Sequence, residues 1–174
     1  MGVMFSGAAI FNGDLSRWSM HRVVSIGYMF KQATAFNGDL NKWNTSRVTS
    51  MRATFYGAKA FNGDISAWDT SNVAHMWHET GNVGMFMGAS AFNRDISKWN
   101  VGKVTSMYRQ FHGAAAFNQD LSAWNVSGTT SMYQMFISCA AFNSDLSGWD
   151  TSRVTDMAYM FSGASSFNGN ISTW

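Results

Sequence analysis

The sequence predicts a repeat solenoid of the α/β class, in one domain that covers residues 1–174, and three periodic observations indicate it. The pair Phe-Asn recurs at a constant interval, apart from one longer step in the middle of the chain. Its phenylalanines are Phe11, Phe36, Phe61, Phe92, Phe117, Phe142 and Phe167. A tryptophan follows each of them by seven positions, and a second phenylalanine precedes each by six. A fixed period of this length indicates units that bury their apolar faces by stacking on one another.

Each unit is predicted to contain one short helix. In the last unit, Thr151 or Ser152 is suited to cap the helix N-terminus and Gly163 to end the helix. Between and just beyond them, apolar side chains stand at Val154, Met157, Met160, Phe161 and Ala164. These intervals of three and four residues describe one face of a helix.

The segment after each Phe-Asn pair is predicted to be a short strand. Residues 11–18, with the sequence FNGDLSRW, are too few for a helix and include turn-forming Asn and Gly. Coils stacked about 4.8 Å apart would join these strands into a parallel sheet on one face. The prediction is therefore an array of about seven repeats, each with one helix and one strand.

Two polar columns accompany the repeat, and the sequence favours a structural role for both. The asparagines of the Phe-Asn pairs are expected to satisfy backbone groups in the turns; they are Asn12, Asn37, Asn62, Asn93, Asn118, Asn143 and Asn168. Carboxylates two residues further on are expected to accept backbone N–H bonds, with a row of calcium sites as the alternative. They are Asp14, Asp39, Asp64, Asp95, Asp120 and Asp145.

The repeat unit resembles that of a known family. Its pattern, W-[DN]-x-S-x-V-T-x-M-x-x-M-F-x-G-A-x-x-F-N-x-D-[LI]-S-x-W, is similar over the whole chain to the repeat of BspA-like surface proteins, found in mycoplasma lipoproteins and related to leucine-rich repeats. The resemblance implies a right-handed, leucine-rich-repeat-like coil and an adhesion or interaction role with variable targets. It also implies a place at the cell surface or outside the cell, although an organellar assembly stays open.

Composition excludes several classes of function. A formal net charge of +2 is too small for a protein whose main ligand is nucleic acid, so none is expected as a partner. No run of apolar residues is long enough to cross a membrane. No nucleophile, base and orienting group recur as a set, and the single Cys139 takes a position that is alanine in other units. The sequence therefore predicts no enzyme, no cofactor and no metal.

Basic residues form two columns of their own. One column lies four residues after the tryptophans and comprises Arg22, Arg47, Lys103 and Arg153. The other immediately precedes tryptophans and comprises Arg17, Lys42 and Lys98. Both columns suit a solvated edge that balances the aspartates, and the alternative is a stripe that binds an acidic glycan. The tryptophan column is expected to be structural, and its edges, where exposed, would offer flat faces to a sugar or a protein.

One unit is longer than the others, and this insertion is the best candidate for a specific contact. Six extra residues lie within 77–84 and bring the only tryptophan outside the column, Trp77, and the only glutamate, Glu79. His78 and Asn82 complete the predicted binding bulge. His75, His78 and Glu79 have a helical spacing that could hold a metal, but the HExxH motif is absent, which favours a hydrogen-bonding loop.

The sequence therefore predicts a non-catalytic interaction or adhesion scaffold that presents an extended surface to a protein or glycan. A structural subunit inside a large assembly is the alternative. Ice binding is a remote third, based on partial threonine rows with gaps at Met20, Ala74 and Val101; the rows are Thr45, Thr70 and Thr151, and Thr49, Thr105, Thr130 and Thr155.

The two ends carry a further expectation. Aligning Phe11 with Phe167 places Met1 on Met157, inside the repeat, and Trp174 stops halfway through a unit. Neither end has the polar capping segment that an isolated solenoid uses. The expectation is a portion of a longer array in which Met1 is not the initiator, or ends that further repeats or neighbouring subunits cover.

Overall fold

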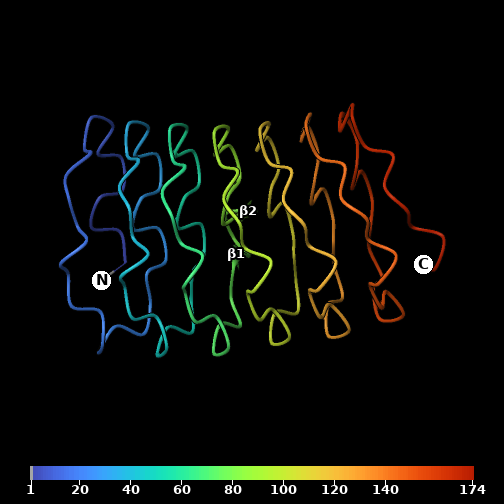
Figure 1. The fold of residues 1–174 in the computed structure, drawn as a ribbon, viewed down its shortest axis with the longest axis horizontal. Coiled ribbons are helices and arrows are strands. Elements are labelled where there is room, and N and C mark those ends of the chain that lie inside the picture. The colour runs from blue at the N-terminus through green and yellow to red at the C-terminus, as the bar shows by residue number, and fades with distance from the viewer. Residues whose placement is uncertain (1) are drawn as a thin grey trace.

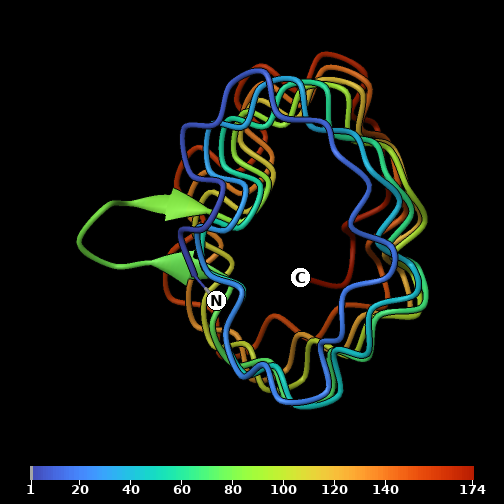
Figure 2. The same cartoon turned by 90° about the vertical axis from the view of Figure 1, so that its left-hand side faces the viewer.

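A computed structural model describes residues 2–174 as a stack of coils that advances along the long axis (Figure 1). Viewed down that axis, successive coils superpose around a common outline (Figure 2). We number the coils one to seven in chain order and call the phenylalanine that precedes each Phe-Asn pair the turn phenylalanine. The expectation for Met1 lies outside the described residues.

The predicted fold class, an α/β solenoid with one helix and one strand per coil, is wrong. No helix occurs between residues 2 and 174, and the strands there are β1 (Trp77–His78) and β2 (Val83–Gly84), an antiparallel pair inside the insertion. In place of the predicted parallel sheet, neighbouring coils meet at isolated parallel bridges. These are Ser25 with Ser50, Ser50 with His75, Ser106 with Ser131, and Ser131 with Asp156.

Left-handed backbone conformations prevent the predicted helices. In the segment 151–164, Tyr159 has φ of 59° and Gly163 has φ of 73°, and a left-handed residue interrupts a right-handed helix. The Met160 N–H donates to the Met157 carbonyl at 3.1 Å, so the chain advances by turns that link residues three apart. Such turns also place residues three and four apart on one side, which explains the helix-like apolar pattern.

The N–H groups that a helix would use internally bond to the next coil. The turn phenylalanine Phe111 donates to the Met135 carbonyl at 2.9 Å, and Phe136 donates to Met160 at 2.9 Å. Arg109 and Gly113 on either side of Phe111 donate likewise to the next coil, at 3.0 and 2.8 Å. Alternate N–H groups thus join the coils, which is why these segments stack rather than wind into helices.

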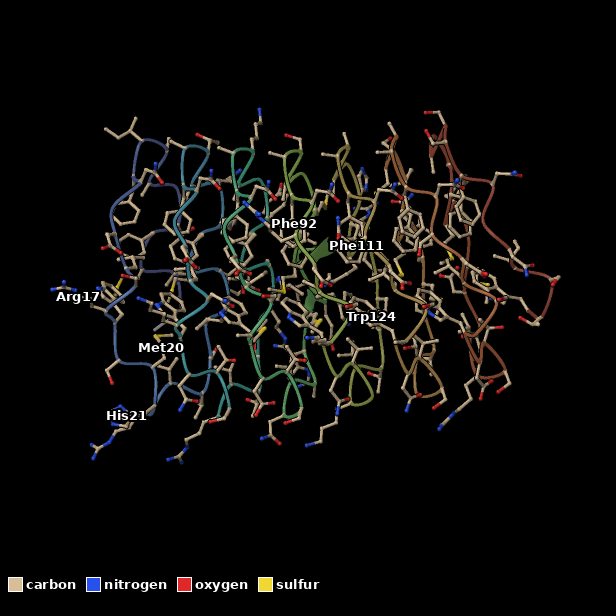
Figure 3. The ribbon with its side chains drawn as sticks, in the orientation of Figure 1. Arg17, Met20, His21, Phe92, Phe111 and Trp124 are labelled. Carbon is tan, nitrogen blue, oxygen red and sulfur yellow. The ribbon has the colours of Figure 1, made fainter. Side chains whose placement is uncertain are left out.

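Three aromatic columns fill the interior. Turn phenylalanines stack on one another with ring centroids 5.6–5.7 Å apart, and the Phe-Asn phenylalanines with centroids 5.8–6.0 Å apart. Tryptophans of neighbouring coils also stack; the ring centroids of Trp68 and Trp99, for example, lie 6.1 Å apart. Figure 3 shows these side chains, with Phe111 and Trp124 labelled, and Arg17 and His21 pointing away from the stack. Burial of large rings in column after column supplies the main stabilisation.

The tryptophan column belongs to the core from Trp43 to Trp149, which confirms the structural role expected for it, and a contact surface of exposed tryptophan edges is wrong there. Trp124 is 2% exposed, and its indole N–H donates to the Ile96 carbonyl of the preceding coil at 3.0 Å. Cys139 is also buried; its thiol donates to the Phe111 carbonyl, and burial raises its pKa to about 12. No helix of the described chain is long and apolar enough to cross a membrane.

Candidate binding surface

The insertion forms a hairpin that projects from the side of the stack (Figure 2). In an ordinary step between coils, the Phe30 N–H donates to the Thr54 carbonyl, whereas across the insertion the Phe55 N–H donates to the Met85 carbonyl. The second step is longer by six residues, which therefore leave the coil at this point. Trp77 pairs with Gly84 and His78 with Val83, so residues between β1 and β2 form the tip.

The four predicted bulge residues divide into two pairs. Glu79 and Asn82 are exposed at the tip, whereas Trp77 and His78 are half-buried because they fold back onto the stack. His78 Nδ1 accepts the Gly81 N–H at 3.0 Å, and its Nε2 lies 3.1 Å from Thr80 Oγ1. The hairpin is thereby held in one shape by its own side chains.

Aromatic rings extend from the hairpin in both directions along the stack. The His78 ring meets Tyr28 of coil two edge-on, with centroids 5.1 Å apart, and Trp77 lies 5.2 Å from Tyr108 of coil five. Tyr108 stacks on Tyr133 at 4.9 Å, and Tyr133 meets Tyr159 of coil seven at 6.2 Å. We call this set the aromatic row: Tyr28, His78, Trp77, Tyr108, Tyr133 and Tyr159.

Arg109 lies at the centre of this row. Its guanidinium carbon lies 5.3 Å from the Tyr108 ring centroid and 5.9 Å from that of Tyr133, both within cation–π range. Arg109 Nε donates to Gln134 Oε1 at 2.6 Å, and Nη1 donates to the Asn82 carbonyl at 3.2 Å. The side chain thus ties the hairpin to coils five and six.

The surroundings of the row are aromatic and basic. We define the turn segments as the residues from three before to three after each turn phenylalanine; they are 2–8, 27–33, 52–58, 83–89, 108–114, 133–139 and 158–164. All five tyrosines of the chain lie in these segments, together with Lys31, Arg52 and Arg109 and no acidic residue. Burial and the Arg109 charge lower the pKa of His112, which favours its neutral form at pH 7. Exposed Glu79 supplies the only carboxylate of the hairpin.

The predicted basic column lies on a different stretch of the coil from the hairpin. Its members are all exposed: Arg22, Arg47, Lys103 and Arg153. Lys103 Nζ donates to Asn72 Oδ1 of the preceding coil at 2.8 Å. The pKa of Asp69 is lowered mainly by hydrogen bonds from Ser71 and to a smaller extent by the positive charge of Lys103. This column is therefore an edge of mixed charge, and Arg17, Lys42 and Lys98 are likewise exposed.

The predicted polar columns form hydrogen bonds within the fold. Each asparagine from Asn12 to Asn143 accepts, through Oδ1, the backbone N–H of the asparagine in the next coil at 2.6–3.0 Å. Each aspartate of the column accepts the N–H of the residue two positions on at 2.8–2.9 Å. These oxygens serve the backbone, as Asx-type turns do.

The aspartate turns predict loss of stability in acid. Hydrogen bonds from the serine two residues on lower the pKa of several such carboxyl groups below the ordinary value; they are Asp14, Asp69, Asp95, Asp145 and Asp150. A lowered folded pKa gives stability that is complete above the unfolded pKa and is lost as the pH falls through the folded value. We expect the contribution of these aspartates to the free energy of unfolding in urea to be constant from pH 7 to about pH 5 and to fall below about pH 4. The lowered pKa of His112 adds a separate loss that begins as the pH falls below about 6.5.

Asn170 supplies the matched control for this prediction. It occupies the same position in coil seven, where its amide oxygen accepts the Ser172 N–H at 3.0 Å without a titrating group. The double variant Asp95→Asn and Asp145→Asn should keep both turns and lose part of the acid dependence. An unchanged pH profile in this variant would show that the turns do not cause the effect.

The threonine rows behave differently from each other. Thr45 and Thr70 are buried, and their hydroxyls donate to the Asp69 and Asn100 carbonyls at 3.0 Å. Thr130 and Thr155 are exposed, but their hydroxyls donate to carbonyls of the preceding coil at 3.1 Å. The hydroxyl groups of these four threonines therefore donate their protons to backbone carbonyls within the fold.

Between residues 2 and 174, no three His, Cys, Asp or Glu side chains are close enough together to hold a metal ion. A small surface pocket between coils three and four is lined by Ser66, Ala67, Asp95 and Lys98. In this pocket, Asp95 accepts the Ser97 N–H through Oδ1 at 2.9 Å.

A family model matches the whole chain in two overlapping stretches. The model, described as "Mycoplasma protein of unknown function, DUF285", matches residues 1–83 and again residues 80–174. The chain belongs to this family. The two DUF285 matches meet within the hairpin, so the insertion lies at the junction of two matched stretches. No curated protein and no solved structure matches the chain.

The aromatic row was missed by sequence reasoning, although one signal indicates it. The prediction named Trp77 and His78 but none of Tyr28, Tyr108 and Tyr133, nor Arg109. Those tyrosines occupy two different positions relative to the turn phenylalanine, so they form no single column. Confinement of every tyrosine to the turn segments, which lack acidic residues, was the available signal.

Proposed function

We propose that this chain is a non-catalytic interaction scaffold of the adhesion type, which binds its partner along the aromatic row and the hairpin. One observation carries the proposal: half-buried aromatic rings and Arg109 form a continuous band from coil two to coil six, which exposed Tyr159 extends to coil seven. Tyr, Trp and Arg dominate the binding energy of protein interfaces. The coil backbone holds them in place before binding, which reduces the entropy lost on association.

The resemblance of the repeat to BspA-like surface proteins supports the adhesion role, and on the same ground we propose that the protein lies at the cell surface. When intact cells that produce the protein are treated with a membrane-impermeant biotin reagent, the protein should become labelled. Labelling only after cell lysis would contradict the surface location. The binding role is tested separately, by the deletion of residues 77–82.

Deleting residues 77–82 tests the binding role. The deletion restores the common period of the repeats at the point where the hairpin leaves the coil, so the far-ultraviolet circular dichroism spectrum should change little. Saturable binding on arrays of proteins and glycans should weaken by at least about tenfold, the scale of losing a central contact. Ile10→Ala, at a residue 93% exposed in coil one, is the control and should bind as the wild type.

Two results would contradict the proposal. Array binding that survives the deletion unchanged would reject the hairpin as the contact region. A wild-type chain that binds no array component, and aggregates when purified alone, would favour the structural subunit of a large assembly.

A further inference from the structure

We propose that Arg109 is the anchor of this surface and that it binds a carboxylate of an acidic protein segment, with Tyr108, Tyr133 and Trp77 packed around the contact. This inference rests on the proposed function and adds the chemistry of the partner. It follows from how the guanidinium is held, which of its N–H groups are free, and which charges surround it.

The guanidinium is fixed in place before any partner binds. Tyr108 and Tyr133 lie beside it, Gln134 accepts from Nε at 2.6 Å, and the Asn82 carbonyl accepts from Nη1 at 3.2 Å. These contacts come from coil five, coil six and the hairpin. An arginine immobilised in this way loses little side-chain entropy when it binds a ligand.

Part of the guanidinium remains available. An arginine carries five N–H donors, and two of those of Arg109 have acceptors in the fold. The other three have no hydrogen-bond acceptor among residues 2–174. They lie on the two terminal nitrogens, whose planar arrangement matches the two oxygens of a carboxylate.

The charges of the turn segments favour an anionic ligand. No turn segment contains Asp or Glu, and the charged residues of the turn segments are Lys31, Arg52 and Arg109. Glu79 is exposed at the hairpin tip. A half-buried arginine without a carboxylate partner within the described chain gains a counter-ion when an acidic group docks.

Ring geometry favours a protein over a glycan. Tyr108 and Tyr133 stack at 4.9 Å with an interplanar angle of 16°, and the Arg109 guanidinium lies close to both rings. Their flat faces are therefore partly occupied by neighbours, whereas a sugar ring packs on an open aromatic face. Ring edges, phenol hydroxyls and a guanidinium suit side chains and backbone carbonyls of a polypeptide.

The chain itself provides a variant of Arg109 that should fold. Arg109 has φ of 50°, and Gln134 occupies the equivalent position of coil six with φ of 56°. Arg109→Gln therefore places in coil five the residue that coil six already carries, and it removes the charge. Arg109→Lys retains the charge but lacks the planar pair of terminal nitrogens. Arg153→Gln, at an exposed arginine of the basic column, is the matched control.

The experiment is a titration of the full chain with a peptide of ten glutamates, followed by the Nε–H signals of arginine in ¹⁵N NMR spectra. The Arg109 signal should shift in a saturable manner and the Arg153 signal should not. Affinity should fall at least tenfold in Arg109→Gln, severalfold in Arg109→Lys and not at all in Arg153→Gln. Higher salt should weaken the binding.

Several results would overturn this inference. They are an Arg109 signal that does not move with the peptide, an equal loss of affinity in Arg153→Gln, or a signal that responds to polygalacturonate, a carboxylated glycan, and not to the peptide. Array binding that Arg109→Gln retains but the deletion of residues 77–82 abolishes would also overturn it, and would leave the proposed function intact. A wild-type chain that binds the peptide through Arg109 but no array component would overturn the proposed function alone.

Discussion

Replacing Phe111 by alanine is expected to lower the free energy of unfolding by about 3–5 kcal/mol, the usual cost of removing a fully buried phenylalanine side chain. Phe111 is completely buried and stacks between Phe86 and Phe136, with ring centroids 5.6 Å away on each side. Its ring also lies 4.1 Å from Phe117 of the same coil. The substitution leaves a gap in the middle of a column that the neighbouring coils cannot fill without losing their own stacking.

Urea unfolding of Phe111→Ala, followed by tryptophan fluorescence, measures this cost. Ile10→Ala is the control, because Ile10 is 93% exposed and its substitution should change stability by less than about 0.5 kcal/mol. If Phe111→Ala were as stable as the control, the aromatic columns would not be the source of stability.

Replacing Asn93 by alanine is expected to cost about 0.5–1.5 kcal/mol, the usual net contribution of a hydrogen bond, because it removes a side-chain acceptor that links two coils. Asn93 Oδ1 accepts the Asn118 N–H at 2.9 Å and the Gln119 side-chain amide at 2.7 Å. The loss should appear as a lower urea midpoint with little change in the slope of the transition.

Asn168→Ala is the matched control for the ladder. Asn168 donates its backbone N–H to Asn143 Oδ1 at 2.6 Å, a bond that alanine retains, and its own side-chain oxygen accepts no hydrogen bond from the residues described. The same chemical change should therefore cost little there. Equal losses at both positions would mean that the asparagine ladder contributes nothing to stacking.

The sequence predicts the stacking of like side chains well, for a physical reason. Only a chain that returns to the same place at a fixed interval can bury Phe and Trp of every repeat while keeping Asn and Asp in line. The one repeat that is longer than the others likewise locates the insertion at residues 77–82, because residues in excess of the common period must project from the stack. These features depend on period and not on local conformation.

Local conformation is where the prediction of helices was wrong. Apolar residues three and four apart, such as Met157, Met160 and Phe161, are typical of a helix but also arise from successive turns. Gly163 is one of two left-handed positions in its coil, and a left-handed glycine is also typical of a helix end. The other position is held by Tyr159, a residue type that gives no sign of a left-handed backbone.

The aromatic row could be predicted only in part. Trp77 and His78 were selected because the insertion breaks the repeat. Their contacts with Tyr108 and Tyr28 depend on the hairpin folding back over the neighbouring coils, which no periodic pattern specifies. The role of Arg109 could not be predicted either, because its hydrogen-bond partners Gln134 and Asn82 lie far from it in the sequence.

In this fold, alternate backbone N–H groups of the turn segments bond to the next coil instead of to the preceding helical turn. Scalar coupling across hydrogen bonds, measured by NMR between amide nitrogen and carbonyl carbon, detects this directly. For Phe111, the structure predicts coupling to the carbonyl of Met135. Coupling of the Phe111 nitrogen to the carbonyl of Met107, four residues earlier, would show a helix and contradict this fold.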